Sequence, residues 1–66
     1  MSIGKRLSAR IRALIRTRKT TAEKVAYESG ISKSYLSAVL RCRKSPTVRI
    51  LDRIAKTLEV DVKELF

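Results

Sequence analysis

The sequence lacks most of the groups from which metal centres and disulfide frameworks are built. It has no histidine and one cysteine, Cys42, so neither an intrachain disulfide nor a zinc site with a full ligand set is expected. No apolar run approaches the roughly 18 residues of a membrane span, and residues 1–6 lack the apolar stretch of a secretory signal. We therefore expect a cytoplasmic protein with no cofactor, no metal and no membrane partner.

An enzyme is not expected either. The sequence shows no nucleophile–base pair and no phosphate-binding glycine loop, and 66 residues leave little room for a closed substrate pocket. No small-molecule substrate is evident. A chain of this length forms one domain, residues 1–66, and buries only about 60% of its unfolded surface. Without disulfides or metal, its stability is expected to come from helix packing, alone or together with association with a second copy.

Positive charge is what the chain has in excess. Sixteen Lys and Arg residues against six Asp and Glu residues give a net charge of +10. Residues 1–19 hold seven basic groups and residues 33–49 hold five, with no acid in either block. Such a field attracts polyanions, nucleic acid first and an anionic membrane second.

The apolar residues recur at helical spacing, and breakers are few. The pattern predicts a compact all-α domain of five short helices: Ser2, as the cap, to about 18, then 22–29, 33–40, 48 to about 58, and a last turn or two after Asp61. The inward faces are expected to hold Ile3, Leu7, Ile11, Leu14, Ile15, Val25, Ala26, Leu36, Val39, Leu40, Val48, Leu51, Ile54, Ala55 and Leu58.

Capping residues surround the second and third of these helices. Thr21 is a candidate N-cap, although Lys24 stands where a capping box would have Glu. Gly30 suits a left-handed helix stop, and Ser32 is a good N-cap for the helix that follows. Two short helices joined by a glycine turn are a helix-turn-helix, at about residues 21–41.

The residues of this segment resemble the phage-repressor-like (Xre-type, Cro/repressor) helix-turn-helix family, and the resemblance covers nearly the whole chain. The matching positions are Val25-Ala26, Gly30-Ile31-Ser32 and Leu36-Ser37 in the motif and Pro46, Leu51, Ile54-Ala55, Leu58 and Val60 downstream. The resemblance implies sequence-specific binding of double-stranded DNA and transcriptional regulation, of the repressor or restriction–modification controller type. It also implies a homodimer on a partly palindromic operator.

The resemblance further implies which side chains meet the DNA. Base edges would be contacted from the start of the second motif helix by Ser32, Lys33, Ser34, Ser37 and Ala38. The phosphate backbone would be contacted by Thr21, Ala22, Tyr35, Arg41, Arg43, Lys44, Ser45, Thr47 and Arg49. At the end of the sequence, Val62, Leu65 and Phe66 either seal the core or form a dimer interface.

The chain departs from the family at two sets of positions. Ile15 and Leu40 stand where members often have an Arg–Glu pair, so an apolar contact is expected there. Lys19, Cys42 and Glu59 stand at helix exits that usually have glycine. Each would be strained in the left-handed conformation, so a departure from the family is expected in these loops rather than in the helices.

Other interpretations of the same features stay open. The chain could be an antitoxin-like module that binds a protein through its near-neutral C-terminal segment and DNA secondarily. Arg10 and Arg12 could belong to a solvated face of the first helix, and that helix could lie on an anionic membrane. Cys42 is a small filler or a regulatory thiol between two arginines.

Overall fold

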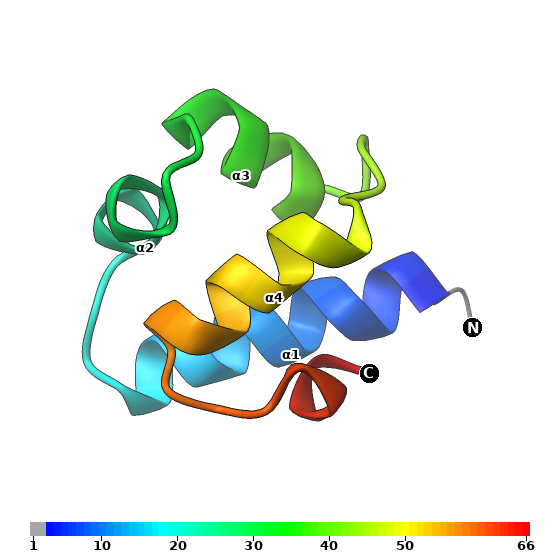
Figure 1. The fold of residues 1–66 in the computed structure, drawn as a ribbon. Coiled ribbons are helices and arrows are strands. Elements are labelled where there is room, and N and C mark those ends of the chain that lie inside the picture. The colour runs from blue at the N-terminus through cyan, green and yellow to red at the C-terminus, as the bar shows by residue number, and fades with distance from the viewer. Residues whose placement is uncertain (1–2) are drawn as a thin grey trace.

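The computed structural model describes residues 3–66 and contains helices only over that range (Figure 1). The elements are α1 (Ile3–Thr17), α2 (Ala22–Ser29), α3 (Lys33–Leu40), α4 (Val48–Thr57) and the 3-10 helix η1 (Val62–Leu65). The all-α prediction is confirmed. The prediction of five helices is corrected to four α-helices and one 3-10 turn. The expected cap at Ser2 lies outside the described residues.

The helices surround α4, which packs against both α2 and η1. The α3 helix packs on α1 and α2, whereas η1 packs on α1 and α4 and makes no contact with α2 or α3. In Figure 1, α2 and α3 accordingly lie at one side of the molecule and η1 at the other, with α1 and α4 between them. The helix-turn-helix therefore has an outer surface that no other element covers.

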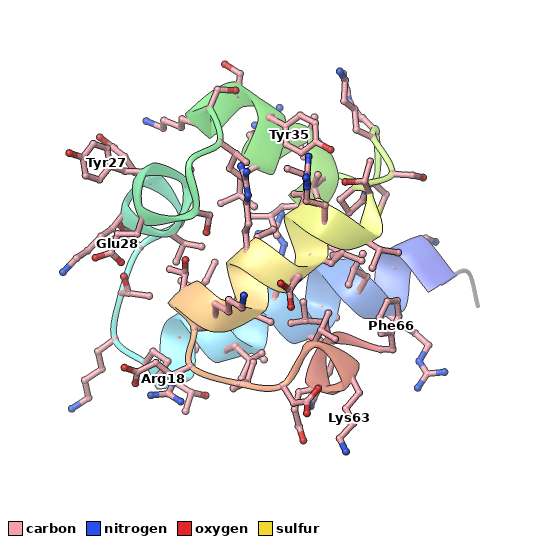
Figure 2. The ribbon with its side chains drawn as sticks, viewed as in Figure 1. Arg18, Tyr27, Glu28, Tyr35, Lys63 and Phe66 are labelled. Atoms are coloured by element: carbon pink, nitrogen blue, oxygen red, sulfur yellow. The ribbon has the colours of Figure 1, made fainter. Side chains whose placement is uncertain are left out.

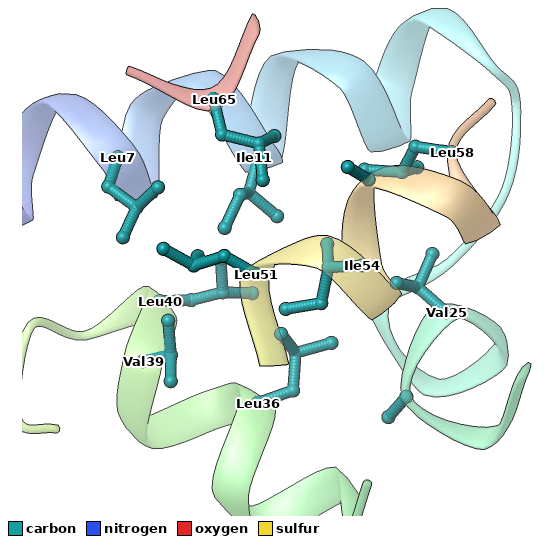
Figure 3. Close-up of a cluster of buried hydrophobic side chains, with 12 residues drawn as sticks. Leu7, Ile11, Val25, Leu36, Val39, Leu40, Leu51, Ile54, Leu58 and Leu65 are labelled. Atoms are coloured by element: carbon teal, nitrogen blue, oxygen red, sulfur yellow. The ribbon is translucent and has the colours of Figure 1, made fainter. Parts of the chain in front are cut away.

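The core draws on every element (Figure 3). Its buried members are Leu7, Ile11, Val25, Ala26, Leu36, Val39, Leu40, Leu51, Ile54, Ala55, Leu58 and Leu65. Eleven of these twelve were predicted from helical spacing, and Leu14 and Ile15 are half-buried against them.

One prediction about an apolar residue is wrong, and one open alternative is decided. Val48 is predicted to face inward, but it is 75% exposed because it is the first residue of α4, ahead of the turns that reach the core. Leu65 suits either the core or a dimer contact by sequence, and it is 0% exposed and packs among α1 and α4 of its own chain. Leu65 therefore seals the core, and no atom of it is left for a partner.

The predicted caps Thr21 and Ser32 are confirmed by their hydrogen bonds, and Thr47 caps α4 in the same way. The hydroxyls of Thr21, Ser32 and Thr47 accept from the backbone N–H groups three residues later, at 3.1, 3.0 and 3.2 Å. Each hydroxyl satisfies one of the N–H groups that a helix N-terminus leaves without a partner. Gly30 ends α2 at φ +73°. The start of α3 is thus set by Gly30 and Ser32 together.

The expectation that the loops would depart from left-handed geometry is wrong. Lys19, Cys42 and Glu59 have φ of 55°, 61° and 59°. After each of them the next residue donates its N–H to the carbonyl five residues back, at 3.1, 2.8 and 2.9 Å. This is the Schellman closure that also follows Gly30, so all four α-helices end in the same way. These bonds give the carbonyls at the helix ends a partner, but they keep Lys19, Cys42 and Glu59 in a left-handed conformation that is strained for residues other than glycine.

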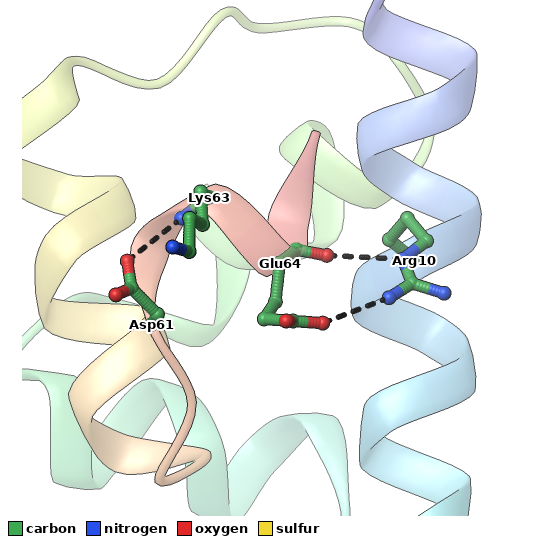
Figure 4. A network of polar contacts seen from close by, with 4 residues as sticks. All are labelled: Arg10, Asp61, Lys63 and Glu64. Atoms are coloured by element: carbon green, nitrogen blue, oxygen red, sulfur yellow. Dashed lines mark hydrogen bonds and ion pairs between the residues drawn. The ribbon is translucent and has the colours of Figure 1, made fainter.

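The basic face of α1 is not merely solvated. Arg10 donates through Nε to the carbonyl oxygen of Glu64 at 3.0 Å and pairs with its Oε2 at 3.4 Å (Figure 4). Arg12 donates to the carbonyl oxygen of Leu40 at 3.3 Å, and the buried Ser8 hydroxyl donates to that same oxygen. Both arginines are exposed, as the solvated-face interpretation expects, and they also hold η1 and the end of α3 against α1.

Ile15 and Leu40, which replace the Arg–Glu pair of the family, lie beside the contact between Arg12 and Leu40. Ile15 and Leu40 line one surface depression, together with Arg12 and Ala22. Apolar side chains thus stand where the pair would be, and a cation from the neighbouring turn of α1 binds the helix end instead.

Over the described part of the chain, no helix combines the length and the apolar character that crossing a membrane requires.

Candidate nucleic-acid interface

The outer surface of α3 gathers most of the residues predicted to contact bases. We call Ser32, Lys33, Ser34, Ser37 and Ala38 the reading face. Lys33 and Ser34 are exposed, and Ser37 and Ala38 are half-buried beside them. All four line one surface depression, with Arg41 and Arg43 at its far end. Ser32 is exposed but lies outside that depression, and its hydroxyl is engaged as the N-cap of α3.

The loop that follows α3 carries two exposed arginines whose side chains have no partner within residues 3–66. We call residues 41–45 the basic loop. Its arginines, Arg41 and Arg43, are exposed, and so are Ser45 and the more distant Arg49. Within residues 3–66 no hydrogen bond or ion pair engages the guanidinium groups of these three arginines. They are available to an anion, as phosphate contact requires.

Lys44 is held differently from its neighbours. Its Nζ lies 5.6 Å from the centroid of the Tyr35 ring, on α3, in a cation–π arrangement (Figure 2 labels Tyr35). An exposed contact of this kind contributes about 0.5–1 kcal/mol. It ties the basic loop to the helix before it, so that the loop is placed relative to the reading face. Tyr35 itself is half-buried, as a residue at a groove wall would be.

Two helix N-termini complete the predicted backbone contacts. Thr21 and Ala22 begin α2, and Thr47 precedes α4. The hydroxyls of Thr21 and Thr47 are already engaged as caps. What these positions can offer to phosphate is the remaining backbone N–H groups and the positive end of each helix dipole.

Sequence reasoning missed Glu23 as a neighbour of the reading face. Its Oε2 lies 3.3 Å from Lys33 Nζ, which joins the first turn of α2 to the first residue of α3. The signal was present, because an acid stood in the first turn of α2 and one cation opened α3. Only the tertiary arrangement of the two helices brings them together.

The other sequence predictions concern the far side and Cys42. Val62 is half-buried and Phe66 is 54% exposed, next to the buried Leu65. Cys42 is exposed at the exit of α3, where it has a φ of +61°. Among residues 3–66 there is no group of three or more His, Cys, Asp or Glu side chains placed to hold a metal ion.

Solved structures share this fold along almost its full length. The restriction-modification controller protein C.AhdI from Aeromonas hydrophila superposes with a TM-score of 0.91 at 25% identity, covering 96% of both chains. The clp gene regulator ClgR from Corynebacterium glutamicum gives a TM-score of 0.92 at 25% identity, over 98% of this chain and 69% of that one.

Sequence comparison points the same way. The HTH-type transcriptional regulator SlrR of Bacillus subtilis is 46% identical over 59 residues, 86% of this chain, which spans only 39% of SlrR. The uncharacterized HTH-type transcriptional regulator y4dJ of Sinorhizobium fredii is 37% identical over 98% of this chain and 84% of its own length. Residues 11–65 match the helix-turn-helix family profile. The chain therefore belongs to the helix-turn-helix family (HTH_3), whose function is DNA-binding transcriptional regulation.

Proposed function

We propose that this protein is a transcriptional regulator that reads a specific sequence in duplex DNA with α3 in the major groove. The observation that carries the proposal is the continuity of the reading face with the two free arginines of the basic loop, in one surface depression. Small hydroxyls and one ammonium group suit base edges, whereas guanidinium groups suit phosphate. The helix would read, and the loop beyond it would hold the backbone.

The second part of the proposal is that two copies bind together. The partly exposed Val62 and Phe66 begin and follow η1, on the side of the molecule away from α3. A two-fold contact there leaves both reading faces free for half-sites about 34 Å apart on a partly palindromic operator. We place this activity in the cytoplasm, on the nucleoid.

Selection from a random duplex pool tests the proposal. The purified protein should enrich one sequence class with two related half-sites. Fluorescence anisotropy should then give a Kd about 10³-fold or more below that for a scrambled duplex. The variant Lys56→Ala is the matched control and should bind like the wild type, because Lys56 is an exposed residue of α4 that pairs with Asp52 and belongs neither to the reading face nor to the proposed dimer contact. Equal affinity for every duplex would refute sequence-specific regulation, and a one-to-one complex at saturation would refute the dimer.

A further inference from the structure

An exposed ion pair stands at the edge of the reading face. Lys33 Nζ lies 3.3 Å from Glu23 Oε2, and the two side chains are 73% and 72% exposed. Both residues line one surface depression with Tyr27 and Ile31, between α2 and the start of α3. Because the pair is open to solvent, it contributes little to stability. It is also open to whatever approaches the reading face.

Lys33 has two competing ways to meet DNA. It is the one charged residue between positions 32 and 40. Its ammonium group is a compact charge on a flexible stem, so it can reach a base edge or swing to a phosphate. The first contact carries sequence information and the second does not. What holds Lys33 therefore decides how selective the reading face is.

Glu23 is placed to influence both ways of binding. It lies in the first turn of α2, where the positive end of the helix dipole and the free N–H groups attract phosphate. A carboxylate at that point repels a phosphate. The same carboxylate holds Lys33 Nζ, which has three donors and can keep this partner while it donates to guanine O6 or N7.

We propose that Glu23 is a specificity-determining residue. It directs Lys33 toward a base edge and disfavours contact of either helix start with phosphate. It therefore weakens binding to nonspecific DNA more than it weakens binding to the selected site. This inference rests on the proposed function, because it assigns a role within the same interface. It concerns selectivity and not binding as such.

The variant Glu23→Gln tests this, since it keeps the shape of the side chain and removes its charge. Anisotropy titrations across a salt series should use the selected duplex and a scrambled duplex of the same length. Binding to the scrambled duplex should tighten about two- to fivefold, the scale of one exposed ion pair. Its log–log salt slope should steepen by about 0.9 as Lys33 gains a phosphate. The ratio of the two dissociation constants should fall.

Glu28→Gln is the matched control. Glu28 is an exposed acid on the same helix, but it lines a different depression, with Arg18 and Thr57 (Figure 2). This variant has the same net charge as Glu23→Gln, so it should shift binding to both duplexes equally and leave their ratio unchanged. In a Lys33→Met background, Glu23→Gln should lower the ratio of the two dissociation constants less than it does in the wild type, because only the repulsion of phosphate at the start of α2 remains. Thermal unfolding checks that all variants are folded.

The outcomes separate the two proposals. If Glu23→Gln shifts both duplexes by the same factor, as Glu28→Gln does, the role assigned to Glu23 is wrong and the proposed function stands. If Glu23→Gln lowers the ratio of the two dissociation constants equally with and without Lys33, the ion pair with Lys33 plays no part in selectivity. A wild-type protein that prefers no duplex contradicts the proposed function itself.

Discussion

The two basic stretches of the chain have similar composition and opposite use. In the first, Arg10, Arg12 and Arg18 donate to backbone carbonyls of residues 28 to 54 positions away. In the second, the side chains of Arg41, Arg43 and Arg49 make no hydrogen bond or ion pair within residues 3–66. The first three arginines hold the fold together, and the second three are left for a partner.

The difference follows from where each block lies relative to helix ends. Arg12 and Arg10 of α1 reach Leu40 at the end of α3 and Glu64 in η1, and Arg18, just after α1, reaches Glu59 just after α4. Helix C-termini expose carbonyls without partners and carry partial negative charge, so they attract cations. The basic loop also starts at a helix end, because Arg41 is the C-cap of α3, but the Leu40 carbonyl there already accepts from Arg12 and Ser8. Net charge alone therefore does not identify a DNA-binding surface; the availability of the cations does.

The largest expected effect is on DNA affinity. Removing two phosphate contacts in Arg41→Ala/Arg43→Ala should weaken binding to every duplex by about one to two orders of magnitude at physiological salt. The thermal unfolding midpoint should stay within about 2 °C of the wild type, because neither side chain supports the fold. Anisotropy and circular dichroism measure the two quantities.

The paired variant in α1 should behave in the opposite way. Arg10→Ala/Arg12→Ala should lower the free energy of unfolding by about 1 kcal/mol, since exposed contacts are screened by water. That corresponds to about 4–8 °C in the midpoint for a domain of this size. Below that temperature, DNA affinity should change less than in the loop variant. A larger affinity loss from the α1 variant would contradict the division of labour.

Lys33→Ala should change selectivity more than affinity. Discrimination at one base step should relax by about 1–3 kcal/mol if Lys33 reads a guanine. Binding to single-base variants of the selected duplex measures this, with Lys56→Ala on α4 as the control of equal charge. Equal weakening on all duplexes would instead make Lys33 a phosphate contact.

Ser8→Ala tests how α1 holds the reading helix. The Ser8 hydroxyl is buried and shares the Leu40 carbonyl with Arg12. Its removal should cost about 1 kcal/mol in urea unfolding. Because Arg12 stays on the same oxygen, the loss in a Ser8→Ala/Arg12→Ala double variant should exceed the sum of the single losses. Strict additivity would show that the two donors act independently.

The smallest expected effect is a gain. Cys42→Gly should stabilise the protein by about 0.5–1 kcal/mol, because glycine adopts the observed φ of +61° without steric cost. Cys42→Ala keeps the strain and serves as the control. No gain from glycine over alanine would mean that the left-handed residue is not strained in solution.

Local signals were enough to predict most of the fold. Gly30, Ser32 and Thr47 end or begin helices through bonds spanning three to five residues, and the sequence displays both partners. Helical spacing likewise identified the buried faces, with Val48 as the exception because spacing does not tell whether a first turn reaches the core.

What the sequence could not predict depends on contacts between distant elements. The helix end that lies beside a long side chain such as Arg10 or Arg12 decides which carbonyl it contacts. The Glu23–Lys33 pair forms because α2 and α3 bring the two residues together. Leu65 looked equally suited to a core or to an interface. Only its packing against α1 and α4 decided for the core.

The salt dependence of DNA binding tests the central claim most directly. Anisotropy between about 50 and 200 mM salt gives a log–log slope that counts the phosphates neutralised. Arg41→Ala/Arg43→Ala should reduce the magnitude of the slope by about 1.8, and Arg10→Ala/Arg12→Ala should leave it unchanged. If both variants reduce the slope equally, the two basic blocks bind DNA alike and the division of labour between them does not exist.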